Sequence, residues 1–104
     1  MKQLGINNFS GKRVWIIGAS SGIGEACANA LLKLGAQVAL SSRRKERLEQ
    51  IAHTAKPEQT LILPLDVTIQ LQITSAHQNI MSTWGGLDLL LFVSGMYVPL
   101  RADN

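Results

Sequence analysis

Three closely spaced glycines are the residues whose types and spacing point most directly to chemistry. They are Gly18, Gly22 and Gly24, and Ser20 and Ser21 lie between them. Glycines let a backbone approach a phosphate group without a clash from a Cβ atom. The N–H groups at the start of a following helix attract the same negative charge. The spacing predicts a pyrophosphate-binding turn with two hydroxyls near the phosphates, against the alternative of a tight turn that only packs a helix on a sheet.

The residues around this turn predict a strand before it and a helix after it. Residues 14–17 are a short apolar run rich in β-branched side chains, as in a buried strand. Gly35 is at the position expected for the C-cap of this helix. The apolar stripe expected to face the sheet consists of Ile23, Ala26, Cys27, Ala30, Leu31 and Leu34.

The same alternation continues along the chain. Residues 37–40 predict a second strand, and apolar residues from Leu48 to Ala55 predict a helix that Pro57 ends. Residues 61–65 predict a third strand, in which Pro64 lacks a ladder donor and favours an edge position or a strand end.

A third helix and a fourth strand complete the pattern. Thr68 is the expected N-cap of a helix whose stripe runs from Ile69 to Trp84 and which Gly85 ends. Residues 87–93 are almost wholly apolar, which is typical of a strand in a parallel sheet covered by helices. The sequence therefore predicts an α/β fold with an open parallel sheet of about four strands and three helices.

Size and composition limit the classes of protein that fit. The chain has 104 residues, which allows a single domain, and 46% of them are hydrophobic, which excludes intrinsic disorder. The net charge of +3 comes without a dense basic run, so nucleic acid is not an expected partner. One cysteine excludes an internal disulfide framework, and no apolar stretch approaches the length of a membrane span. We expect a cytoplasmic protein with no membrane partner and no metal site.

The motifs, taken in order, resemble those of the short-chain dehydrogenase/reductase family over residues 12–95. The glycine turn matches the glycines of the family motif Thr-Gly-x-x-x-Gly-x-Gly, and three further segments match its ribose, adenine and Asn-Asn-Ala-Gly positions. The resemblance implies a Rossmann-like doubly wound sheet that binds a nicotinamide dinucleotide. It assigns the cofactor to Gly18, Ser20, Ser21, Gly22, Ile23, Gly24, Ser42, Arg43, Asp66, Val67, Ser94 and Gly95.

The residues after the second strand favour NADP(H) over NAD(H). An acid at this point would accept hydrogen bonds from the ribose 2′-hydroxyl and repel a 2′-phosphate. The sequence has Ser42 and then Arg43, whose guanidinium suits a phosphate. Lys45 and Arg47 are expected on a solvated helix face. Asp66 either accepts from the adenine amino group or caps the third helix.

Two local positions depart from the family pattern. Ile17 replaces the threonine before the first glycine, and Phe92 and Val93 replace the paired asparagines. Because removal of both polar partners can be nearly neutral, we expect an apolar contact between strand ends and an unchanged sheet.

The family's catalytic serine and its Tyr-x-x-x-Lys are absent from these 104 residues. Tyr97 and Arg101 have the right spacing, but Pro99 between them disfavours the helix that would align them. We therefore assign no catalytic residue, and Ser94 falls at the alanine of the family motif.

Three hypotheses for the function remain open. The chain is the cofactor-binding half of an NADP(H)-dependent oxidoreductase, which acts on a carbonyl or alcohol and is not catalytic as 104 residues alone. It is alternatively a non-catalytic nucleotide-binding module, or an inactive remnant. The outer edge of the fourth strand is expected to be open, which predicts self-association or pairing with a partner chain.

Overall fold

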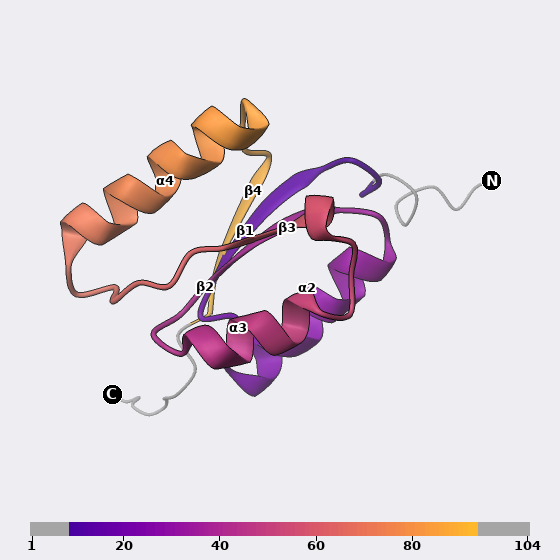
Figure 1. Cartoon of the computed structure of the whole chain (residues 1–104), viewed down its shortest axis with the longest axis horizontal. Helices are drawn as coiled ribbons and strands as arrows, with labels where there is room; N and C mark the ends of the chain where they lie inside the picture. Colours follow the sequence, from indigo (N-terminus) through magenta and orange to yellow (C-terminus); the bar gives the residue numbers. More distant parts are fainter. Residues whose placement is uncertain (1–8, 94–104) are drawn as a thin grey trace, which may run out of the picture.

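The computed structural model describes residues 9–93, which form a parallel sheet with helices on both faces (Figure 1). The strands are β1 (Arg13–Ile17), β2 (Gln37–Ser41), β3 (Thr60–Ile62) and β4 (Leu89–Phe92). The helices are α2 (Gly22–Lys33), α3 (Lys45–Ala52) and α4 (Gln70–Trp84), and η1 (Pro57–Gln59) is a short 3₁₀ turn. The predicted α/β fold is confirmed.

The strands lie in the order β3-β2-β1-β4, and every neighbouring pair is parallel. β1 is therefore central, with Val14 opposite Val38 on one side and opposite Leu89 on the other. The chain winds outward from β1 through β2 and β3, then returns past β1 to add β4. This reversal places the topological switch point at the carboxyl ends of β1 and β4, the position where open α/β sheets bind ligands.

Alternate residues of β1 supply two separate cores. Val14 and Ile16 pack with α2 and α3, whereas Trp15 and Ile17 pack on the opposite face with α4. Figure 1 shows this arrangement, with α2 and α3 together on one side of the sheet and α4 on the other. The buried Trp15 indole donates from Nε1 to Ser41 Oγ over 2.8 Å, so the one polar group of its ring is satisfied.

The predicted apolar stripe of α2 is wrong in its rotation. Ile23 is 70% exposed, and Ala26 and Ala30 are exposed as well. The residues that α2 buries are Gly24, Ala28, Leu31 and Leu32. Small and apolar residues lie on most sides of this helix, so their spacing alone is compatible with two overlapping buried faces. The glycine turn decides between them, because it brings Gly24 against the backbone of Gly18.

β3 is shorter than the predicted strand over residues 61–65, because Pro64 interrupts the hydrogen bonding to β2. It ends at Ile62, yet the chain continues beside β2. Leu63 N donates to Leu40 O and Leu65 N donates to Ser42 O, over 2.9 Å in each case. Pro64 has no N–H to give between them.

The other predicted boundaries move by a few residues. α3 ends at Ala52, and Pro57 begins η1 rather than ending that helix directly. The N-cap residue of α4 is Ile69, so the predicted cap at Thr68 is wrong. The Thr68 hydroxyl donates instead to Asp66 Oδ1.

β4 is an edge strand of the sheet formed by residues 9–93, and its side chains are largely uncovered. Leu90 is 49% exposed and Phe92 is 62% exposed. The expectation that the outer edge of this strand is open is confirmed within residues 9–93.

An ion pair joins β1 to the start of β4 at the amino end of the sheet. Arg13 donates to Asp88 Oδ2 from its backbone N over 2.8 Å and from Nε over 3.0 Å. Asp88 N in turn donates to Arg13 O over 2.8 Å. The hydrogen bond from the Arg13 side chain lowers the pKa of Asp88 to about 2.

This pair makes a pH-dependent contribution to stability. The pKa of a carboxyl in an unfolded chain is about 4, so the pair stabilises the fold above that pH and loses its effect as the pH falls toward 2. We expect D88N to lower the unfolding temperature at pH 7, and the difference from the unsubstituted chain to shrink between pH 4 and pH 2.

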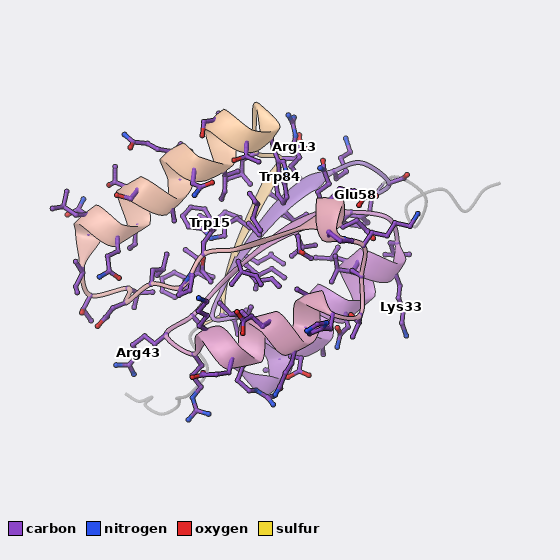
Figure 2. The ribbon with its side chains drawn as sticks, viewed as in Figure 1. Arg13, Trp15, Lys33, Arg43, Glu58 and Trp84 are labelled. Carbon is purple, nitrogen blue, oxygen red and sulfur yellow. The ribbon has the colours of Figure 1, made fainter. Side chains whose placement is uncertain are left out.

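Thermal unfolding followed by circular dichroism from pH 7 to pH 2 measures this difference. The matched control is E58Q, which neutralises an exposed carboxyl on η1 (Figure 2). A difference for D88N that stays the same at every pH would contradict the prediction.

Candidate functional site

The turn after β1 is one in which two of the glycines are sterically required. Gly18 has a φ of 94°, in the left-handed region, and a Cβ atom there would overlap the backbone oxygen of Val93. A Cβ atom on Gly24 would overlap the backbone oxygen of Gly18. The absence of a side chain at these two positions therefore allows the end of β4 and the start of α2 to pack closely against the end of β1.

Gly22 differs from its two neighbours in the motif, because the space beside it is open. Apart from its chain neighbours and the nearby backbone of its own helix, no atom of residues 9–93 lies within 4 Å of the position that a Cβ atom on Gly22 would take. Gly22 is also the first residue of α2, where the backbone N–H groups of the first turn lack helical acceptors. This combination fits a phosphate group held at the start of α2.

The two serines of the turn have different surroundings. Ser21 is the N-cap of α2, with its hydroxyl donating to Gly18 O over 2.9 Å and accepting from Gly24 N over 3.0 Å. Its hydrogen is therefore engaged within the turn. Ser20 is half-buried and takes no part in this cap. Of the two predicted phosphate ligands, Ser20 is the one that the cap leaves available.

The carbonyl group of Ser41 ties the glycine turn to the end of β2. It accepts from Gly18 N over 2.8 Å and from Ala19 N over 3.1 Å. Ser42 follows in the chain, and its hydroxyl accepts from Arg44 N over 3.0 Å. This bond bends the chain just after β2, between the glycine turn and α3.

Arg43 lies in this bend and is exposed. Figure 2 shows its side chain projecting beside the start of α3, at the opposite end of the molecule from Lys33. The structure thus brings the predicted phosphate ligand Arg43 to the same edge of the sheet as the glycine turn.

Asp66 and Val67 lie in the loop after β3, at this same edge. Asp66 Oδ1 accepts from Thr68 N over 2.9 Å and from Thr68 Oγ1 over 2.7 Å. These bonds lower the pKa of Asp66, and the positive charge of Arg43 adds a smaller effect in the same direction. Asp66 is therefore an ionised acceptor that stabilises the turn before α4, and Val67 is 43% exposed beside it.

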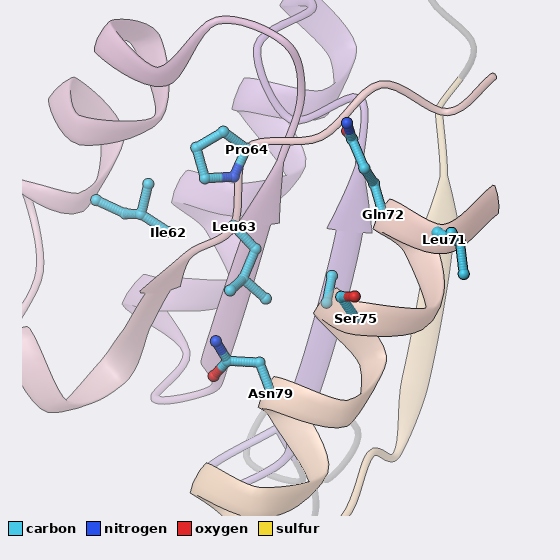
Figure 3. A pocket seen from close by; sticks show the side chains of 8 residues that line it. Ile62, Leu63, Pro64, Leu71, Gln72, Ser75 and Asn79 are labelled. Carbon is cyan, nitrogen blue, oxygen red and sulfur yellow. The ribbon is translucent and has the colours of Figure 1, made fainter. Parts of the chain in front are cut away.

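Gln72 is a contributor to this loop that the sequence did not reveal. Its Oε1 accepts from Asp66 N over 2.7 Å, and Figure 3 shows the side chain reaching from α4 to the loop. Gln72 also lines an open hollow of about 440 Å³ between β3 and α4. None of the residues around this hollow belongs to the glycine turn, so we do not include it in the candidate site.

Other sequence expectations lie partly or wholly outside the described residues. Ser94, Gly95, Tyr97 and Arg101 are outside them. Among residues 9–93, no three His, Cys, Asp or Glu side chains group in a way that could hold a metal ion. No helix in that range is long and apolar enough to cross a membrane.

Comparison with known proteins relates this arrangement to oxidoreductases. The family model described as short chain dehydrogenase matches residues 12–103. An uncharacterized oxidoreductase of Staphylococcus aureus strain USA300 is 36% identical over 89 residues, which are 86% of this chain and 38% of the relative. The human dehydrogenase/reductase SDR family member 7 is 38% identical over 89 residues, which are 80% of this chain and 26% of the relative.

Solved structures with similar folds agree with the sequence matches. A short-chain type dehydrogenase/reductase from Mycobacterium marinum has a TM-score of 0.76 and 34% identity, over 86% of this chain and 37% of its own. A 3-ketoacyl-(acyl-carrier-protein) reductase from Brucella melitensis, solved with NADH, has a TM-score of 0.74 and 30% identity, over 79% of this chain and 33% of its own. The chain therefore spans less than two-fifths of the length of each of these relatives.

The different surroundings of Gly22 and Gly24 predict that the same substitution changes ligand affinity at one position and folding stability at the other. G22A places a methyl group in the open space at the start of α2, so we expect folding stability to be kept and affinity for a nicotinamide dinucleotide to fall about tenfold, equivalent to about 1.4 kcal/mol. G24A forces the methyl group against Gly18, so we expect a loss of stability of roughly 1–3 kcal/mol, as for other overpacked sites. Chemical denaturation and fluorescence titration with NADPH measure the two quantities. Equal loss of stability in both variants would contradict this view of the turn.

Proposed function

Because this chain belongs to the short chain dehydrogenase family, we propose that it binds a nicotinamide dinucleotide and prefers NADP(H) to NAD(H). The observation that carries this proposal is the exposed Arg43 in the bend after β2, at the edge of the sheet where the glycine turn lies. The whole relatives are oxidoreductases, and when bound the cofactor supplies or accepts the hydride.

The described residues fit the pyrophosphate and adenosine portions of such a cofactor. The open space beside Gly22 and the first turn of α2 suit the pyrophosphate. The ionised Asp66 suits the adenine amino group, since its Oδ1 is engaged by Thr68 and Oδ2 is the acceptor that we assign to adenine. Val67 and Ile23 are exposed apolar side chains that could contact the cofactor.

The preference for NADP(H) follows from the group that each cofactor presents to the end of β2. NAD(H) presents a 2′-hydroxyl, for which an acidic side chain is the usual acceptor. Ser42 stands there instead, and its hydroxyl already accepts from Arg44 N. A 2′-phosphate would gain charge-assisted hydrogen bonds from Arg43. The Brucella reductase was solved with NADH, so the preference rests on these side chains and not on the shared fold.

The proposal assigns cofactor binding, and not hydride transfer, to these 104 residues. The family's Tyr-x-x-x-Lys, which moves the proton, does not occur in them. In a longer or assembled enzyme, residues 9–93 would hold the adenosine half of the cofactor, and other residues would provide the substrate pocket and the proton donor.

Titration of the chain with NADPH and with NADH tests the proposed preference. We expect R43E to lower affinity for NADPH about tenfold to a hundredfold, the scale of one charge-assisted hydrogen bond, with little effect on NADH. The control K33E makes the same change of charge at the other end of α2 and should change neither affinity appreciably (Figure 2). Equal affinity for the two cofactors before substitution, or equal effects of R43E and K33E, would refute the preference.

We also propose that the 104-residue polypeptide self-associates through β4. This strand contains no charged side chain, and its outer edge is unpaired in the sheet of residues 9–93. The opposite edge strand, β3, has three residues and is followed by Pro64. Edges with neither charge nor proline are the ones that pair with another strand, and two identical neutral strands do not repel each other.

Sedimentation velocity over a range of concentrations tests this self-association. We expect L90K, which places a charge on β4, to shift the polypeptide toward the monomer. The control L71K places the same charge on α4, where Leu71 is already 77% exposed, and should leave the distribution unchanged. A stable monomer at every concentration before substitution would refute the proposal.

A further inference from the structure

Arg47 and Glu25 form an ion pair that the sequence pattern did not indicate. Arg47 was expected on a solvated face of α3, yet its Nη2 lies 2.6 Å from Glu25 Oε1. The two side chains are partly exposed, at 42% and 35%. The contact joins α3 to α2, and these two helices lie side by side on the same face of the sheet (Figure 1).

Both residues lie in the first turns of their helices. Glu25 is the acidic residue of the first turn of α2, directly after Gly24 of the phosphate-binding turn. Arg47 is the third residue of α3, which begins just after Arg43 and Arg44. Because both helices start at the carboxyl edge of the sheet, the ion pair lies at the same edge as the proposed pyrophosphate and 2′-phosphate sites.

A carboxylate in this position opposes the proposed ligand. It benefits from the helix dipole of α2, but it adds a negative charge next to a site that must accept phosphate groups. An ion pair as exposed as this one contributes little to folding stability. Its main consequence is therefore electrostatic, because the guanidinium cancels the charge of Glu25 and fixes the carboxylate on the α3 side of α2.

We propose that Arg47 is a positioning residue for the dinucleotide, acting through Glu25 and not through contact with the cofactor. It neutralises Glu25 and holds that carboxylate toward α3, so that the start of α2 can accept phosphate. This inference rests on the proposed cofactor-binding function. Arg47 then favours dinucleotide binding, whereas its partner Glu25 opposes it.

The opposite signs make the test decisive. We expect R47Q to lower affinity for NADPH about twofold to fifteenfold, the range for one unit charge acting over roughly 10 Å between the dielectric constants of bulk water and of a protein surface. E25Q removes the carboxylate that opposes the phosphate groups, so affinity should rise. In the E25Q background, R47Q should have little further effect, because no carboxylate is left to neutralise, whereas additive effects would show that Arg47 acts independently of Glu25. R47K, which keeps the charge, should retain most of the affinity.

The salt dependence of affinity for NADPH is a second measurement, and a purely structural role of the ion pair would not change it. Titrations with NADPH in about 0.05 M and 0.5 M salt should show the differences among these variants shrinking as ionic strength rises. Circular dichroism confirms that each variant is folded. A brace with no electrostatic role would instead make both single variants bind more weakly, at both salt concentrations.

The outcomes separate this inference from the proposed function. If the chain binds NADPH and R43E alters its preference, but E25Q and R47Q change affinity in the same direction, the role of Arg47 is refuted and the function stands. If the folded chain binds no dinucleotide, the proposed function is refuted and the inference about Arg47 falls with it.

Discussion

At the carboxyl end of β1 the chain must turn in a narrow space between the ends of β2 and β4. Ser41 O accepts from the backbone N–H groups of Gly18 and Ala19 on one side, and Val93 N donates to Ile17 O on the other. A side chain on Gly18 would collide with Val93. Gly18, which permits this crowding, also allows α2 to start beside the sheet. The positions of Ser42, Arg43 and the proposed cofactor site depend on this turn.

The element pattern was predictable because it rests on local signals. A change from strand to helical period at Gly18, and again after the second and third strands, indicated the order of elements and the parallel sheet. The rotation of α2 was not predictable, since residues from Ile23 to Leu32 are small or apolar on most sides. Only the tertiary contact between Gly24 and Gly18 determines which of them are buried.

The candidate site shows the same division between local and distant signals. Asp66 was predictable as an adenine ligand or a cap, and the structure shows it stabilising the turn before α4 through Thr68, without being the N-cap. The contacts of Gln72 and Arg47 were not predictable from the sequence, because they depend on partners that only the fold brings near. Arg47 lies 22 residues from Glu25, and no spacing rule connects the two.

The departures from the family at the strand ends follow from where the side chains point. Ile17 is buried in the core beneath α4, whereas Val93 packs against the core beneath α2 and α3, so the two do not meet as an apolar pair. Phe92 is the register partner of Ile17. The backbone bond from Val93 N to Ile17 O holds the strand ends together in place of a contact between polar side chains. The sheet therefore tolerates apolar residues here because its registration depends on backbone groups. Phe92 is 62% exposed, so the chain presents an apolar surface at the carboxyl end of β4.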